Sequence, residues 1–193
     1  KIGEGYKEDS IKQDNEYEIV EDSEECEDIK TKFDFAPVNL DKTKVMLPLG
    51  LMIGSHVTPI DHHYFQNFDN KEFDIEVYSP GNGDITSIQH MPGAKEDEDY
   101  RIIIEHACGI SSIYIYVSYL PEKIKKYAPS GMNTAGVRIP VEAGELIGYY
   151  KNNLDYNIVD VNFVLSGFTV PEHYRGESWK IYVSNTYNYF NEP

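Results

Sequence analysis

Imidazole and carboxylate side chains gather in one short stretch of this sequence. His56, Asp61 and His62 follow one another there, and His106 ends a later run of β-branched residues. A carboxylate beside imidazoles is a suitable ligand set for zinc. One interpretation of the pattern is therefore a metal site built from His56, Asp61 or His62, and His106.

We favour a structural role for the same residues. The stretch 58–61, Thr-Pro-Ile-Asp, is typical of a tight turn in which the Asp61 carboxylate accepts hydrogen bonds from backbone amides. His56 would then be a hydrogen-bonded partner of a neighbouring strand or of a core tyrosine. Successive side chains of an extended segment point to opposite sides, so at most one of His62 and His63 lies beside Asp61.

Short strands separated by turns must position these side chains. The stretch 75–78 alternates in polarity and meets a dense turn signal at 79–83, and similar runs recur along the chain. The sixteen tyrosines also favour strands. We expect strands over 75–78, 85–88, 101–106, 113–119, 137–141, 146–151, 158–165 and 179–183, with one short helix over 122–127. This series predicts an all-β barrel or sandwich.

Charge excludes some partners of such a domain. The chain has 193 residues, with 33 acidic against 17 basic side chains and a formal charge of −16. An anionic surface repels phosphate groups, so we expect no nucleic-acid partner. The longest apolar run, 45–54, contains a proline and is too short to span a bilayer, so we expect no membrane insertion.

Residues 1–44 differ from the rest in composition. They hold 14 acidic and 7 basic side chains and few apolar ones. We expect an acidic, partly ordered N-terminal arm over 1–44, then one β domain over 45–193 that ends in an edge strand and an aromatic tail. The two cysteines, Cys26 and Cys108, are expected to be thiols; a disulfide that ties the arm to the domain is the alternative.

Two glycine turns give the sequence its most specific pattern. The stretches 77–85 (Val-Tyr-Ser-Pro-Gly-Asn-Gly-Asp-Ile) and 141–148 (Val-Glu-Ala-Gly-Glu-Leu-Ile-Gly) each place glycine between apolar strand residues. Together they resemble the two halves of the barrel-sandwich hybrid, or duplicated hybrid, fold of lipoyl carriers and M23 (lysostaphin-type) metallopeptidases. A carrier would need a Met-Lys-Met motif, and this chain has none. The stretch from His56 to Asp61 instead resembles the His-x-x-x-Asp start of M23 domains, with one extra residue.

The resemblance covers about residues 45–168 and implies roles for particular positions. In M23 peptidases the first His and Asp bind zinc, and a final His-x-His supplies a general base and a third ligand. Asp160 and Asn162 are the best match to that final motif, which leaves Asp160 as the candidate catalytic residue. A further catalytic His of the family falls at Tyr116 or Ser118. Asparagine is a poor zinc ligand, so the family's chemistry is incomplete here.

The departures favour binding over hydrolysis. We expect a non-peptidase, M23-like module of an exported or cell-surface protein. The expected location rests on the first residue, since a chain that begins with Lys1 fits one from which an export signal has been removed. It would bind a glycan, a peptide or a protein partner in a groove lined by Tyr116, Tyr149, Tyr150 and Asn162. One alternative is a zinc-dependent hydrolase with a rebuilt metal site, and another is a structural component of a surface assembly.

Overall fold

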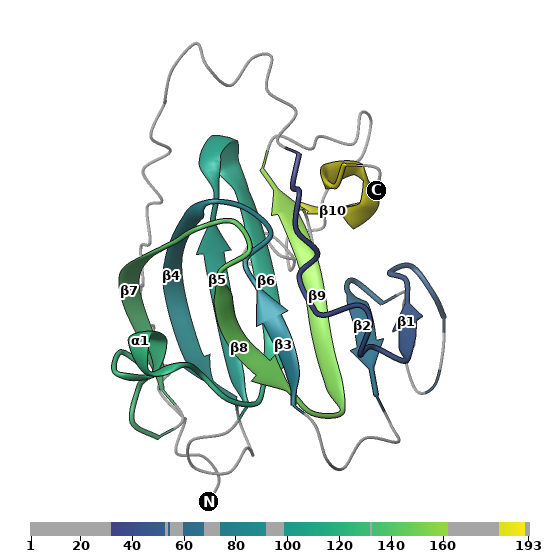
Figure 1. Cartoon of the computed structure of the whole chain (residues 1–193). Helices are drawn as coiled ribbons and strands as arrows, with labels where there is room; N and C mark the ends of the chain where they lie inside the picture. Colours follow the sequence, from purple (N-terminus) through teal and green to yellow (C-terminus); the bar gives the residue numbers. More distant parts are fainter. Residues whose placement is uncertain are drawn as a thin grey trace, which may run out of the picture.

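Strands dominate the part of the chain that the computed structural model describes, which is residues 32–52, 54, 60–67, 74–91, 99–131, 133–161 and 182–191 (Figure 1). The prediction of an all-β fold is confirmed. The strands are β1 (Val45–Leu47), β2 (His63–Gln66), β3 (Ile75–Tyr78), β4 (Gly83–His90), β5 (Tyr100–Glu105), β6 (Ile110–Val117), β7 (Thr134–Val141), β8 (Leu146–Tyr150), β9 (Asn153–Asp160) and β10 (Val183–Ser184). Short helical segments join them: η1 (Ala107–Gly109), α1 (Glu122–Lys125) and η3 (Thr186–Tyr189). None of the helices in these ranges has the length and apolar character to cross a bilayer.

Two antiparallel sheets build the domain. The larger sheet has the strand order β1-β2-β9-β6-β5-β4-β7, and β10 also pairs with β9. The smaller sheet is the two-stranded ribbon β3–β8, which carries part of both glycine motifs. In Figure 1 this ribbon lies in front of the central strands of the larger sheet. The central position of β9, between β2 and β6, makes it the strand that brings distant parts of the chain together.

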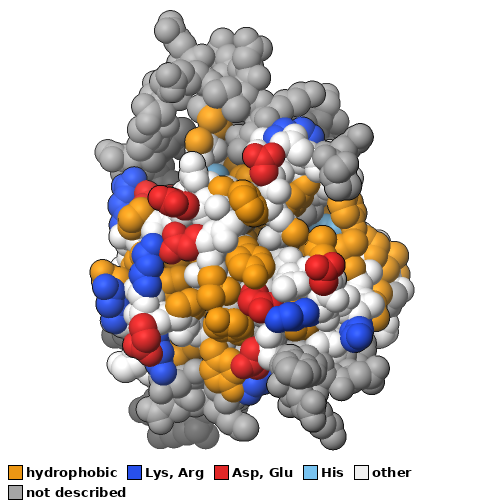
Figure 2. Space-filling view, viewed as in Figure 1, with side chains coloured by type: hydrophobic (Ala, Val, Ile, Leu, Met, Phe, Trp, Pro, Cys, Tyr) orange, Lys and Arg blue, Asp and Glu red, His pale blue; other side chains and the backbone are white. Residues whose placement is uncertain are grey.

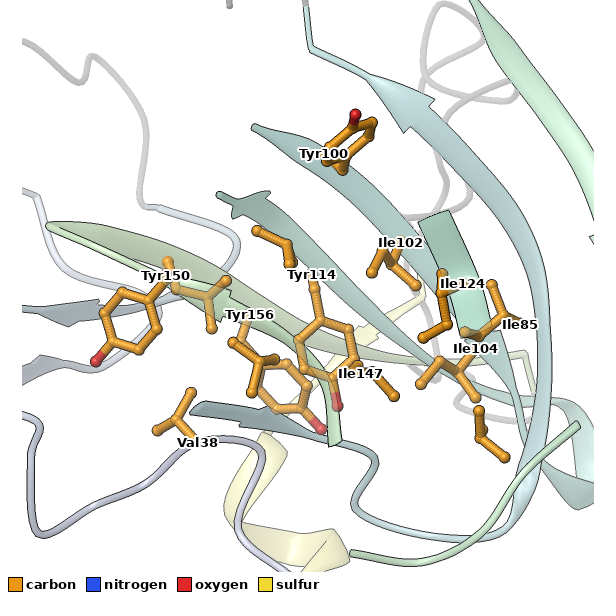
Figure 3. Close-up of a cluster of buried hydrophobic side chains, with 14 of the residues drawn as sticks. Val38, Ile85, Tyr100, Ile102, Ile104, Tyr114, Ile124, Ile147, Tyr150 and Tyr156 are labelled. Carbon is orange, nitrogen blue, oxygen red and sulfur yellow. The ribbon is translucent and has the colours of Figure 1, made fainter. Parts of the chain in front are cut away.

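Side chains of both sheets meet in one core (Figure 3). Strand β5 alternates, so that Ile102 and Ile104 point inward, while Ile147 enters from β8. A Cβ at Gly148 would overlap the side chain of Val117 on β6, so only glycine allows the two sheets to approach this closely. The second glycine motif is thus explained by packing between the sheets.

Most expected strands are present, with one shift that affects the site. The ribbon strand 75–78 has the expected bounds, and the expected helix over 122–127 appears as the single turn α1. The strand expected over 158–165 is instead β9, which begins at Asn153. Its first half, which carries buried polar side chains, was not among the expected strands. Strands β1 and β2 were not expected at all.

The ends of the described chain are bound to each other. The backbone N–H of Phe33 donates to the carbonyl of Tyr189 at 2.6 Å, and the N–H of Asn191 donates to the carbonyl of Phe33 at 3.1 Å. We call residues 32–34 and 188–191 the terminal clasp. The buried Phe33 ring packs 4.8 Å from the ring of His106. Phe33 and Val38 belong to the core, although the sequence placed them in the acidic arm.

The state of Cys108 differs from the expectation. Cys108 forms a disulfide in η1, and its backbone has a left-handed φ of 62°. The prediction of a thiol at this position is therefore wrong. The number of cysteines does not determine their redox state, because two thiols and one disulfide have the same sequence. Cys26, the other cysteine, lies outside the described residues.

Candidate functional site

Strand β9 lies between the strands that carry Tyr64 and Tyr116, and it also contacts the segment that contains Asp61. Asp155, near the middle of β9, is the register partner of Tyr64 on β2 and of Ile115 on β6. Tyr116 follows directly on β6. We call the group formed by Asp61, His62, Tyr64, Tyr116, Asp155 and Asn157 the Asp155 site.

The imidazole of His62 lies between two carboxylates. Its Nδ1–H donates to Asp61 Oδ1 at 2.7 Å, and its Nε2 is 3.4 Å from Asp155 Oδ2. Burial alone would lower the pKa of His62, but the hydrogen bond to Asp61 and the charge of Asp155 outweigh it and raise this pKa. The raised pKa favours the protonated imidazolium, which has no lone pair for a metal ion.

Polar side chains of β9 hold the Asp61 segment in place. The Asn157 amide donates to the backbone carbonyl of Asp61 at 3.2 Å, and the Asn153 amide donates to Asp155 Oδ1 at 2.6 Å. Asp155 and Asn157 are both buried, and a buried carboxylate is costly unless it is paired. The carboxylate of Asp155 therefore depends on His62 and Asn153.

Two tyrosines border the charged groups. The Tyr64 ring meets the His62 ring edge-on, with centroids 4.6 Å apart. Burial raises the pKa of Tyr64, and the charges of Asp155 and Asp61 and the nearby Tyr116 raise it further. The surface around these phenols therefore has a negative potential.

Tyr116 has a backbone conformation that a tyrosine rarely adopts. The β5–β6 register shifts between Tyr100 and Ile102, which forms a bulge, and Tyr116 in this bulge has a φ of 70°. Its side chain is 40% exposed. Strain of this kind recurs at functional sites, where surrounding structure compensates for it.

This conformation makes a stability prediction. We expect Tyr116→Gly to be more stable to urea than Tyr116→Ala by about 1 kcal/mol, because glycine adopts a left-handed φ without a Cβ clash. Both variants lose the phenol, so the comparison isolates the backbone. Equal stability, or a more stable alanine variant, would contradict a left-handed Tyr116.

The structure places the predicted metal ligands in different surroundings. Asp61 and His62 belong to the Asp155 site, whereas His56 lies outside the described residues. His106 is in the core: its Nδ1–H donates to the Asn82 carbonyl at 2.8 Å, and its Nε2 accepts from Ser112 Oγ at 2.9 Å. Burial lowers the pKa of His106, which fits this neutral form. No group of three or more His, Cys, Asp or Glu residues suited to a metal occurs within the described ranges.

The remaining predicted residues do not form one groove. Tyr150 is fully buried, with its hydroxyl 2.9 Å from Thr43 Oγ1. Tyr149 lies on the ribbon β3–β8, where its backbone carbonyl accepts from Ser118 N at 2.7 Å. Figure 2, which looks onto that ribbon, shows hydrophobic side chains gathered over it between charged ones. Asp160 accepts a hydrogen bond from the Tyr189 hydroxyl at 2.6 Å, next to the terminal clasp, and Asn162 lies outside the described residues.

Sequence reasoning missed Asp155, Asn157 and Tyr64. The chain contains an Asp-x-Asn spacing twice, at 155–157 and at 160–162, and the second is the best match to the final M23 motif. In the structure the first pair faces the Asp61 segment, while β9 ends at Asp160. Alternation of Asp155 and Asn157 with the apolar Leu154 and Tyr156 was the signal that pointed to a strand.

The assembled groups can bind but do not resemble a catalytic metal centre. They offer carboxylates, phenol rings and an imidazole whose two nitrogens face protein oxygens. Catalytic zinc keeps three strong protein ligands and a water molecule, and the described side chains of this site do not supply them. No protein-family model matches the chain, and no curated protein matches it either.

Proposed function

We propose that this chain is a non-peptidase, M23-like module of an exported or cell-surface protein, which binds a partner molecule at the Asp155 site. The observation that carries the proposal is the position of His62 between Asp61 and Asp155. The three residues form a group in which one imidazole is shared by two carboxylates, beside an exposed tyrosine. Such a group recognises a ligand through charge and ring contacts and needs no metal.

The order of the elements supports the M23-like part of the proposal. The two glycine motifs pair as the ribbon β3–β8, and the next strand along the chain, β9, carries Asp155 and Asn157 facing Asp61. In the M23 resemblance, the final His-x-His follows the second glycine turn in the same way. The residues matched to that motif are Asp160 and Asn162, and a further family histidine falls at Tyr116 or Ser118. The lack of histidine at these positions supports loss of the hydrolytic chemistry.

The disulfide at Cys108 supports the proposed location. Disulfides form and persist in oxidising compartments and are rare in reducing ones. Export or surface exposure would provide such a compartment.

Zinc analysis and a binding panel test this function together. We expect purified protein incubated with zinc to hold no stoichiometric metal and to cleave no peptide. We also expect saturable binding of at least one member of a panel of peptides and oligosaccharides, followed by nuclear magnetic resonance. Tyr116→Ala should weaken this binding, whereas Tyr127→Ala, which removes another exposed tyrosine, should leave it unchanged.

Two outcomes would contradict the proposal. About one zinc per chain, together with zinc-dependent cleavage, would assign a hydrolase. Assembly into oligomers that depends on added cations, without binding of any panel member, would assign a structural component.

A further inference from the structure

We infer that the Asp155 site recognises a cationic side chain, the ammonium group of a lysine in a peptide ligand, rather than a neutral sugar ring. This inference rests on the proposed function, because it names the ligand class for the same site. Charge, ring geometry and the hydrogen bonds already made within the protein each support it.

Charge gives the first argument. Asp61 and Asp155 carry two negative charges against one positive charge on His62, so the group is net negative even when His62 is protonated. The Asp61 side chain is 31% exposed, whereas that of Asp155 is 8% exposed. A ligand would therefore contact the Asp61 carboxylate directly, and the buried Asp155 carboxylate would attract it electrostatically from a greater distance. The formal charge of −16 on the chain adds to the attraction of a cation.

The tyrosine rings give the second argument. The face of a phenol ring attracts an ammonium ion, and the attraction is stronger where carboxylates add to the negative potential. Tyr116 exposes a large part of its ring beside Tyr64, and Asp61 and Asp155 are near enough to raise the pKa of the Tyr64 phenol. Rings and carboxylates therefore favour the same kind of group.

The amide side chains give the third argument, which separates an amine from a sugar. A sugar ring is held by several hydrogen bonds to its hydroxyl groups, from both donors and acceptors, together with stacking on an aromatic ring. Here the amides of Asn153 and Asn157 each donate to a protein oxygen, and the Gln66 amide donates to Asn153 Oδ1 at 3.1 Å. The amide donors are therefore paired within the fold, and the charge of the exposed Asp61 carboxylate favours a cation over a neutral sugar.

Matched peptides test the inference. The probe is acetyl-Gly-Lys-Gly-Lys-Gly-amide, and its control replaces both lysines by norleucine, which keeps the aliphatic stem without the charge. Binding to the whole chain is measured by calorimetry and nuclear magnetic resonance at low salt and at 0.5 M NaCl, with chitotetraose as the sugar probe. We expect the lysine peptide to bind at least tenfold more tightly than its control, and salt to reduce the difference.

Three variants separate the site from general charge attraction. Asp61→Asn and Tyr116→Ala are each expected to weaken lysine-peptide binding about tenfold. Glu142→Gln removes the same charge from an exposed residue in the β7–β8 turn and is expected to leave binding unchanged. Circular dichroism establishes that each variant is folded before its affinity is compared.

The possible outcomes test the inference about lysine separately from the proposed function on which it rests. Equal weakening by Glu142→Gln and Asp61→Asn would mean non-specific attraction and overturn the inference. Equal binding of the lysine and norleucine peptides, or site-dependent binding of chitotetraose alone, would overturn the inference and leave the proposed function standing. Failure of every probe in the panel and in this series would overturn both.

Discussion

Replacing Asp155 by alanine is expected to lower the free energy of unfolding by about 3 kcal/mol at pH 7. The carboxylate is buried, contacts His62 Nε2 at 3.4 Å and accepts from the Asn153 amide at 2.6 Å. Its removal takes away one of the two carboxylates beside the His62 imidazole and leaves the Asn153 amide without that acceptor. Urea unfolding of the two proteins, followed by circular dichroism, measures the difference.

A double-mutant cycle identifies the cause of that loss. His62→Gln removes the cation, so in this background Asp155→Ala should lose less stability than in the natural chain. We expect a coupling free energy of 1 kcal/mol or more, the range found for residues in direct contact. Additive effects would mean that His62 and Asp155 do not stabilise each other, and the description of the site would fail.

Acid is expected to destabilise the fold through the neighbouring residue, His63. Its side chain is 1% exposed, packs edge-on against Tyr187 at 5.1 Å, and has no hydrogen-bond partner for either nitrogen in the described part of the chain. Burial, with a further contribution from the charge of His62, lowers the pKa of His63 from 6.5 to about 4. The unfolded chain therefore binds this proton more readily than the native one.

The sign and range of the pH effect follow from these two pKa values. Above pH 6.5 His63 is neutral in both states and has no effect, and stability falls as the pH drops from 6.5 towards 4. The loss from this residue is about 3 kcal/mol at the lower end. The contribution of His62 to the pH dependence has the opposite sign. Its raised pKa adds stability at low pH, and this stability is lost as the pH rises through the pKa of His62 in the folded chain.

His63→Phe isolates the effect. Phenylalanine keeps an aromatic ring against Tyr187 and cannot take up a proton. We expect the free energy of unfolding of this variant to fall less between pH 7 and pH 4 than that of the natural chain. The difference between the two changes should be about 3 kcal/mol. Parallel profiles for the two proteins would show that His63 is solvated or hydrogen-bonded in solution.

Local signals made the strands of the ribbon predictable. The strand 75–78 alternates in polarity and runs into a turn in which proline fixes φ and glycine permits conformations closed to other residues, so nearby residues determine where the strand ends. Strand β9 depends on distant partners instead. It lies between β2 and β6 with both faces covered, so Asp155 and Asn157 are stabilised by groups far away in the chain, which local polarity does not reveal.

The same contrast explains what was predicted of the site. Asp61 and His62 are adjacent, and their pairing follows from sequence neighbours alone. The partner Asp155 comes from a strand almost a hundred residues later, and its Asp-x-Asn spacing occurs a second time at 160–162. Only the register of β9 against β2 distinguishes the two pairs.

The terminal clasp has a consequence for how such a domain fits into a longer polypeptide. Residues 32–34 and 188–191 lie side by side, joined by hydrogen bonds between their backbones. A polypeptide that enters through one end and leaves through the other would do so at a single point on the surface. The fold is therefore suited to insertion into a loop of a host protein, and to circular permutation, because neither requires the ends to be moved apart.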